Sequence, residues 1–260
     1  MASRPAFHQW TKSTTSPTSY SRTLATQEFM LSMLNDYARG HSCPYLGVTI
    51  SVQSSGPSAA GFRAEDLQSR IAQAFVHTRW LHPMVACQIQ DRKQMLYKVE
   101  DAVDVAKWAA RTVQTVESQS GWIEPFSKLS REAVLPSEDG DCAFLYLIVE
   151  PEQSGKSQIK QFDLLLHVHH GLTDGAGIRT IMNEVLIGLT SPKLGTCYIW
   201  GGEVERLNPA ALDVSIISDE ATKSVAAMPR EVGSIANTSG LGSEEPRHVL
   251  TTPGSSPSRR

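Results

Sequence analysis

The sequence predicts an α/β fold, because segments typical of strands and segments typical of helices follow one another along most of its 260 residues. Residues 45–53 (YLGVTISVQ) form a β-branched apolar run that ends at turn-forming residues, the pattern of a strand. Residues 64–80 and 175–189 carry apolar side chains three and four positions apart, the spacing of one helical face. Residues 142–150 and 159–169 are apolar runs separated by a polar segment, which predicts two paired strands joined by an exposed loop.

The segment after the first strand predicts a helix and then a hairpin. The helix spans residues 64–80 and ends before Pro83, which cannot continue it. Residues 84–99 alternate in polarity well enough to predict a hairpin, with the charged residues 91–93 (DRK) at its tip. The predicted apolar face of the helix consists of Leu67, Ile71, Ala74, Phe75 and Thr78.

Residues 102–116 predict a further helix, because their apolar side chains also fit one helical face. A polar loop is expected after it, with Pro125, Pro136 and the sequence SEDGD at residues 137–141. The helix predicted at residues 175–189 follows the paired strands, and its wide apolar face indicates that it is packed in the core.

The composition changes beyond about residue 200. Residues 206–217 predict at most one short element, whereas residues 238–260 are dominated by Ser, Gly, Pro, Thr and charged side chains. Such a segment buries too little apolar surface to offset the entropy cost of ordering it, so we expect a disordered tail.

The charge and composition argue against several classes of protein. The formal net charge is -3, with 24 basic and 27 acidic residues mixed along the chain, so no basic surface for nucleic acid or an anionic membrane is indicated. Residues 1–30 lack the apolar run of a secretory signal, and no stretch of about 18 apolar residues spans a bilayer. We therefore expect a cytoplasmic protein that binds neither nucleic acid nor membranes. The four cysteines form no CxxC pair and are expected to be buried thiols: Cys43, Cys87, Cys142 and Cys197.

Residues 161–177 (QFDLLLHVHHGLTDGAG) carry the most informative pattern in the sequence. Side chains alternate in a strand, so His170 continues the row that begins at Phe162, whereas His167 and His169 belong to the opposite row. We expect the row that ends in His170 to face the core. A histidine in that place is partly desolvated, which disfavours its charged form and leaves a neutral ring available as a general base.

The turn after His170 has residues suited to hold the imidazole in place. Gly171 and Gly175 flank a tight connection into the next helix, where glycine relaxes backbone restrictions. Asp174 can accept hydrogen bonds from backbone amides at the helix start or pair with an arginine, and either interaction would fix the direction of the ring. Its predicted role is therefore structural.

Two other readings of these residues remain open at this point. His170 and Asp174 fit a satisfied histidine at a strand end beside a capping aspartate about as well as they fit a catalytic base. A metal site made of His167, His169 and Asp174 is also conceivable, because alternate histidines of a strand can bind one ion. No third-ligand pattern flanks them, so we expect no metal.

Residues 169–175 (HHGLTDG) resemble the HHxxxDG signature of the chloramphenicol acetyltransferase-like superfamily, which includes peptide-synthetase condensation domains, plant HxxxD acyltransferases and fungal trichothecene O-acetyltransferases. The double histidine, the trailing glycine, the strand before them and the helix after them occur together, which makes the match specific. Residues 74–89 (AFVHTRWLHPMVACQI) are similar to the family's helix, "hP" turn and strand. Residues 20–31 (YSRTLATQEFML) look like the opening of the trichothecene-type enzymes.

The resemblance implies a mixed sheet flanked by helices, of which this chain supplies the N-terminal half. By motif position His170 deprotonates an acceptor, which attacks the thioester of acyl-CoA, while Asp174 supports the loop through an ion pair together with Gly175. His169 is expected to face away from His170 and to have a structural role, and a position near the substrate is the alternative for His169 and for Gly171. The family's active site lies in a tunnel between two similar halves, and the DFGWG-like motif of the second half is absent from this sequence.

We therefore expect an O-acyltransferase that moves an acyl group, most plausibly acetyl, from acetyl-CoA to a small alcohol such as a trichothecene-like terpenoid. The expected domains are a flexible N-terminus at residues 1–19, an acyltransferase-like domain at residues 20–210 and a partly disordered tail at residues 211–260. Three alternatives stay open: a homo-oligomer that completes the site, a non-catalytic remnant that acts as a binding or assembly module, and amide formation on carrier-protein substrates.

Overall fold

The computed structural model describes most of the chain. The described ranges are residues 8–39, 42–52, 63–151, 159–191 and 198–210. The predicted tail and Cys197 lie outside these ranges.

A four-stranded mixed sheet forms the centre of the fold. The strand order is β3-β8-β7-β6, in which β3, β8 and β7 are antiparallel and β6 is parallel to β7. Its strands are β3 (Tyr45–Ser51), β6 (Val113–Glu117), β7 (Ala143–Val149) and β8 (Gln161–Val168). The predicted first strand and the predicted strand pair are therefore confirmed.

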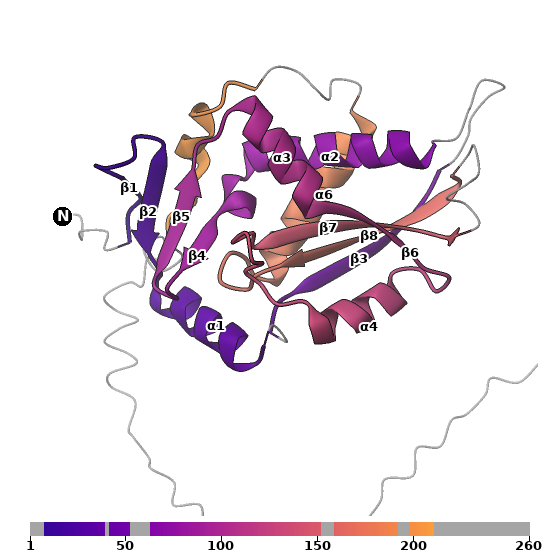
Figure 1. Cartoon of the computed structure of the whole chain (residues 1–260), viewed down its shortest axis with the longest axis horizontal. Coiled ribbons are helices and arrows are strands. Elements are labelled where there is room, and N and C mark those ends of the chain that lie inside the picture. The colour runs from indigo at the N-terminus through magenta and orange to yellow at the C-terminus, as the bar shows by residue number, and fades with distance from the viewer. Residues whose placement is uncertain (1–7, 40–41, 53–62, 152–158, 192–197, 211–260) are drawn as a thin grey trace, which may run out of the picture. The chain divides into compact units, whose positions relative to one another are not determined.

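Helices cover both faces of this central sheet, as Figure 1 shows. One face packs against α2 (Ala64–Leu81), α3 (Ala102–Thr112) and α6 (Gly175–Thr190), and the other packs against α4 (Ile123–Glu132). The mixed sheet flanked by helices that the sequence predicts is thus confirmed, as are the helices predicted at residues 64–80 and 175–189. Among the described helices, none combines the length and the apolar character needed to cross a membrane.

A second, smaller sheet lies beside the first and has the order β1-β2-β5-β4, with every pair antiparallel. Its strands are β1 (Thr11–Lys12), β2 (Ser19–Thr23), β4 (Gln88–Gln90) and β5 (Gln94–Lys98), and α1 (Thr26–Tyr37) follows β2. Its core includes Met84, Met95 and Tyr97, which are nearly inaccessible to solvent. Within residues 1–19, where we expected a flexible terminus, β1 pairs with Tyr20 and Ser21 of β2.

The hairpin predicted at residues 84–99 begins later than expected. Pro83–Ala86 form a 3-10 helix, and the first strand starts only at Gln88. The tip lies at residues 91–93 as predicted, where Asp91 and Arg92 have positive φ angles of 50° and 59°. Proline at the start of a helical turn needs no N–H partner, which explains why Pro83 both ends α2 and starts the 3-10 turn.

The helix predicted at residues 102–116 is too long. It ends at Thr112, and Val113–Glu117 form β6 beside β7. Val113 packs with the helices on one face of the sheet and Val116 packs on the other face, near α4. A spacing of three residues places two side chains on one face of a helix but on opposite faces of a strand. Either structure therefore accounts for apolar side chains at Val113, which is buried, and at Val116, which is partly buried.

The polar loop predicted around residues 125–141 contains a helix, α4 (Ile123–Glu132), that we did not predict. Pro125 lies in the first turn of α4, where the missing N–H of proline costs no hydrogen bond. Phe126 and Leu129 of α4 pack against the central sheet beside Leu165. Treating every proline as a loop marker was therefore wrong here.

Candidate active site

The histidine motif lies at the end of β8, between two neighbouring strands of the central sheet. Leu164, Leu166 and Val168 pack toward α2 and α6, while Leu165 packs toward α4. The strand is therefore buried on both faces, and the alternation predicted from the sequence is confirmed. Residues 169–174, here called the motif turn, connect the strand to α6.

His170 is half-buried and is held by a hydrogen bond within the motif turn. Its Nδ1 lies 3.2 Å from the carbonyl oxygen of Thr173. A carbonyl oxygen only accepts, so this contact requires Nδ1 to carry the hydrogen and leaves Nε2 as the acceptor nitrogen of the neutral ring. A ring in this tautomer can accept a proton at Nε2.

Asp174 caps α6 through two backbone amides. Its Oδ1 accepts hydrogen bonds from Ala176 N–H (3.0 Å) and Gly177 N–H (2.8 Å). The aspartate is solvent-exposed, and no arginine among the described residues pairs with it. Of the two interactions that the sequence allowed, the structure therefore has the helix cap and lacks the arginine pair within the described ranges.

A different arginine–aspartate pair supports the motif turn from the neighbouring strand. Arg111 makes a bidentate contact with the buried carboxylate of Asp141, through Nε to Oδ2 and through Nη2 to Oδ1 (3.0 Å). The next residue, Cys142, accepts the backbone N–H of His169 at 2.8 Å. The pKa of Arg111 is raised because its guanidinium donates to Asp141. Sequence reasoning assigned Asp141 to a loop and missed this contact.

Close packing, and not a left-handed backbone, explains the glycines of this region. Neither Gly171 nor Gly175 has a positive φ angle, so the conformational freedom that we expected glycine to supply is not used. A Cβ on Gly171 would lie 3.0 Å from Ile89 Cδ1, and one on Gly177 would lie 1.9 Å from Thr173 Oγ1. A Cβ on Gly175 would meet nothing within 4 Å. The crowded glycines are therefore Gly171 and Gly177.

The two other histidines of the motif region are buried. His169 Nδ1 accepts the N–H of Gly171 at 3.0 Å, and burial lowers the pKa of His169 to about 4. His167 stacks on Tyr45 with ring centroids 4.0 Å apart, and burial lowers the pKa of His167 to about 3. Both rings are therefore neutral near pH 7. Among the described residues, no three His, Cys, Asp or Glu side chains are grouped so that they could hold a metal ion.

A hollow of 250 Å³, here called the first hollow, lies beside His170. Gly171 and Asp174 of the motif turn also line it, whereas His169 does not. The lining also includes an ion pair between buried Arg22 and partly buried Glu28, in which Arg22 Nη1 and Nη2 each lie 2.7 Å from a carboxylate oxygen of Glu28. Sequence reasoning did not identify this pair, although residues 20–31 were part of the family resemblance.

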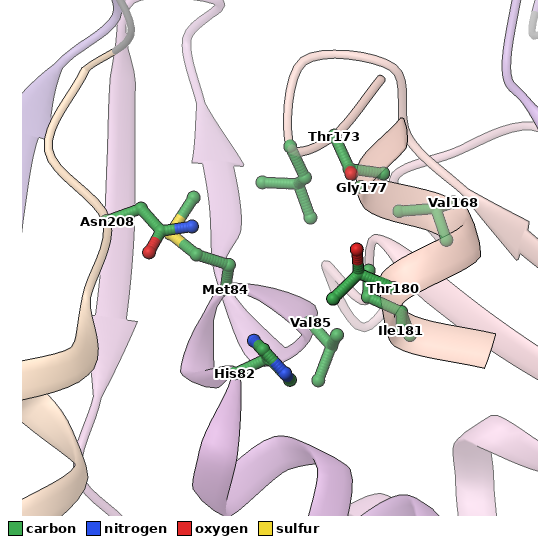
Figure 2. A pocket seen from close by; sticks show the side chains of 10 residues that line it. His82, Met84, Val85, Val168, Thr173, Gly177, Thr180, Ile181 and Asn208 are labelled. Carbon is green, nitrogen blue, oxygen red and sulfur yellow. The ribbon is translucent and has the colours of Figure 1, made fainter. Parts of the chain in front are cut away.

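A second hollow of 260 Å³ lies next to the first (Figure 2). His82 and Thr180 line only the second hollow, and His170 lines only the first. The two hollows share five lining residues, which are Met84, Leu172, Thr173, Gly177 and Asn208. The hollow beside His170 and the second hollow are therefore neighbours that share part of their lining.

Residues 198–210, here called the return segment, bring Asn208 to both hollows through contacts distant in sequence. Trp10 Nε1 donates to the backbone carbonyl of Asn208 at 2.8 Å. The hydroxyl of Tyr97 donates to the fully buried carboxylate of Glu203 at 2.7 Å, and Glu203 also accepts the N–H of Gly201. Arg206 Nε donates to the carbonyl of Trp80 at 2.8 Å, with the guanidinium carbon 3.8 Å from the centre of the Trp80 ring.

Three cysteines are buried free thiols, as the sequence predicted: Cys43, Cys87 and Cys142. Cys43 donates to Asn35 Oδ1 at 2.8 Å near the motif turn, and burial raises the pKa of Cys43 to about 11. Burial also raises the pKa of Cys142 to about 12 and raises that of Cys87.

Comparisons with known proteins agree with this fold. A family model described as 15-O-acetyltransferase Tri3 matches residues 2–242. The acyl-CoA-dependent acyltransferase MAC1 of Pseudozyma antarctica (strain T-34) is 27% identical over 198 residues, which cover 69% of this chain and 35% of MAC1. The structure of TRI3 trichothecene 15-O-acetyltransferase from Fusarium sporotrichioides matches this chain with a TM-score of 0.68 and 19% sequence identity. The match covers 86% of this chain and 47% of the TRI3 chain. The chain thus spans about half, or less, of the length of these relatives, and the structural likeness establishes the shared fold.

Proposed function

The chain belongs to the Tri3 family of 15-O-acetyltransferases, and we propose that it moves an acyl group, acetyl in the simplest case, from acyl-CoA to a hydroxyl of a small secondary metabolite. A trichothecene-like terpenoid alcohol is the acceptor that we favour. The observation that carries the proposal is the contact between His170 Nδ1 and the Thr173 carbonyl, which leaves Nε2 as the acceptor nitrogen of the neutral ring in a residue that lines the first hollow. Our proposal includes a cytoplasmic location.

In the proposed reaction, His170 acts as a general base and then as a general acid. Nε2 takes the proton of the acceptor hydroxyl while its oxygen forms a bond to the thioester carbonyl carbon. The carbon–sulfur bond then breaks, and His170 returns the proton to the leaving thiolate, so the products are an ester and free CoA. A positioned base of this kind contributes about 10²–10⁴-fold to the rate.

The other motif residues would act by holding His170 in place. Asp174 caps α6 and so restrains the end of the motif turn from which Thr173 contacts the ring. His169 accepts from Gly171 and restrains the start of the turn. We therefore propose Asp174 and His169 as positioning residues, and we propose that Gly171 lies near the substrate because it lines the first hollow.

The test is to replace His170 and measure transfer of labelled acetyl from acetyl-CoA to a trichothecene alcohol. We expect His170→Ala to reduce the rate at least about 100-fold, because the base is lost. His170→Gln is the matched control for shape, since it keeps a polar side chain that cannot take the proton, and it should be equally inactive. Both variants should unfold at the same urea concentration as the parent chain, and transfer at the parental rate by either variant would refute the proposal.

A second candidate is a binding or assembly module without turnover, supported by the 47% coverage of TRI3 and the 35% coverage of MAC1. Size-exclusion chromatography combined with an acyl-CoA binding assay separates the two candidates. An oligomer that binds acyl-CoA favours an enzyme whose site is completed by a second copy, and a monomer that does not bind favours the module. Amide formation on carrier proteins is disfavoured if a free CoA thioester supports turnover.

A further inference from the structure

The second hollow has a lining that the proposed transfer step does not use. Four segments contribute to it: the junction between α2 and the 3-10 turn after it, the end of β8 with the motif turn, the first half of α6, and the return segment. Figure 2 shows His82 and Val85 on one side of this space and Thr180 and Ile181 on the other, with Asn208 and Met84 at one end. Five lining side chains are apolar, and four others carry hydrogen-bonding groups: His82, Thr173, Thr180 and Asn208.

Three of these polar side chains have hydrogen-bonding capacity left for a ligand. Within the described ranges, neither ring nitrogen of His82 makes a hydrogen bond or an ion pair. Thr180 donates its hydroxyl hydrogen to the carbonyl of Ala176 at 3.2 Å, and the oxygen can still accept. Asn208 uses its main-chain carbonyl to bind Trp10, so that contact leaves the side-chain amide available.

This lining selects among chemical classes of ligand. A hydrocarbon acyl chain would cover the polar groups without bonding them, which costs free energy for each group left unpaired. A phosphate group would lack its usual partners, because no Arg or Lys lines the second hollow. An apolar carbon skeleton that carries oxygen functions fits both parts of the lining.

We propose that His82, Thr180 and Asn208 are specificity-determining residues that bind an oxygen function on the side of an alicyclic acceptor away from its reacting hydroxyl. The inference rests on the proposed function, in which the reacting hydroxyl of the acceptor points past Leu172 toward His170. The shared residues Met84 and Leu172 border both hollows, so the second hollow is close enough to the first for one acceptor to contact the lining of both. Recognition and chemistry thus occupy neighbouring spaces.

The test uses two probes with one carbon skeleton, menthol with one hydroxyl and p-menthane-3,8-diol with two. Methyl NMR titrations of the full chain report binding through Ile181 and Met84, which line the second hollow. We expect the diol to bind roughly fivefold more tightly than menthol, the effect of about one additional hydrogen bond. Thr180→Val and His82→Phe should each remove most of this preference while binding of menthol is retained.

Thr190→Val is the matched control, because Thr190 also belongs to α6, bonds to carbonyls of its own helix and lines neither hollow. It should keep the parental preference for the diol. Equal affinities for the two probes in the parent chain, or methyl shifts away from the second hollow, would overturn the inference. A parent chain that prefers the diol but transfers no acetyl would refute the proposed function alone, and acetyl transfer without that preference would refute the inference alone.

Discussion

The two walls around His170 are held in different ways. Inside the motif turn, three contacts join residues no more than three positions apart: His170 with Thr173, Asp174 with Gly177, and His169 with Gly171. One longer-range bond, from His169 N–H to the carbonyl of Cys142, joins the start of the turn to the neighbouring strand. The return segment is held by contacts across more than a hundred positions, such as the bond between Tyr97 and Glu203. The chemistry of the site therefore depends on local geometry, whereas the shape of the hollows depends on the tertiary fold.

Acid should have the largest effect, and it acts on two buried rings, His169 at the start of the motif turn and His167 in β8. Burial lowers the pKa of His169 to about 4 and that of His167 to about 3, from an ordinary value of 6.5. Well above pH 6.5 both rings are neutral in the folded chain and in the unfolded chain, so protonation of these rings does not reduce the free energy of unfolding. Between pH 6.5 and about 4 the unfolded chain binds more protons than the folded one, so stability falls as the pH falls.

We expect the free energy of unfolding in urea to decrease between pH 7 and pH 4 by roughly 3 kcal/mol for each of these two rings. His167→Phe keeps the stacking on Tyr45 and removes the titrating nitrogens, so its stability should depend less steeply on pH. Identical pH profiles for the parent chain and this variant would contradict the assignment.

Loss of the Glu203 carboxylate should have the next largest effect on stability, and it affects the return segment. Glu203→Ala leaves the buried hydroxyl of Tyr97 and the N–H of Gly201 without a partner, which should cost about 2–3 kcal/mol in urea unfolding. Tyr97→Phe removes the hydroxyl but leaves Glu203 bonded to Gly201, and should cost less. Transfer per folded molecule should fall mainly through a higher KM for the acceptor; an unchanged KM would mean that the return segment does not shape the acceptor site.

The helix cap of the motif turn should give the smallest change in stability. Asp174→Ala removes two amide bonds at the start of α6 and should cost about 1 kcal/mol. Asp174→Asn is the matched control, because asparagine also caps helices and should keep most of the stability. If Asp174 positions His170 through the turn, kcat should fall for alanine and recover for asparagine, whereas a fall in both variants would point to a role for the charge.

The same difference explains which features the sequence predicts. Helix α6, strand β8 and the cap at Asp174 depend on neighbouring residues, and periodicity and motif spacing were enough to predict them. The strand at Val113 and the helix that contains Pro125 were missed because tertiary packing decides between the local alternatives there. Local signals were ambiguous in both segments.

The partners of the candidate site show this limit most clearly. Nothing local to Arg111 indicates that it pairs with Asp141 thirty positions later, and the pair appears only when β7 is placed next to the end of α3. Asn208 likewise reaches the hollows only after the return segment packs against Trp10 and Trp80. Contacts of this kind depend on which elements are neighbours in the folded chain, and spacing along the sequence does not encode that directly.

The burial of the thiols protects the proposed donor from a side reaction. Acyl thioesters exchange readily with free thiolates, and an ionised cysteine close to His170 would take the acyl group for itself. Because burial raises the pKa of Cys43 to about 11, little of that side chain is ionised at neutral pH. Cys43 can therefore lie beside the motif turn without becoming acylated, and acyl groups delivered there remain available to the alcohol.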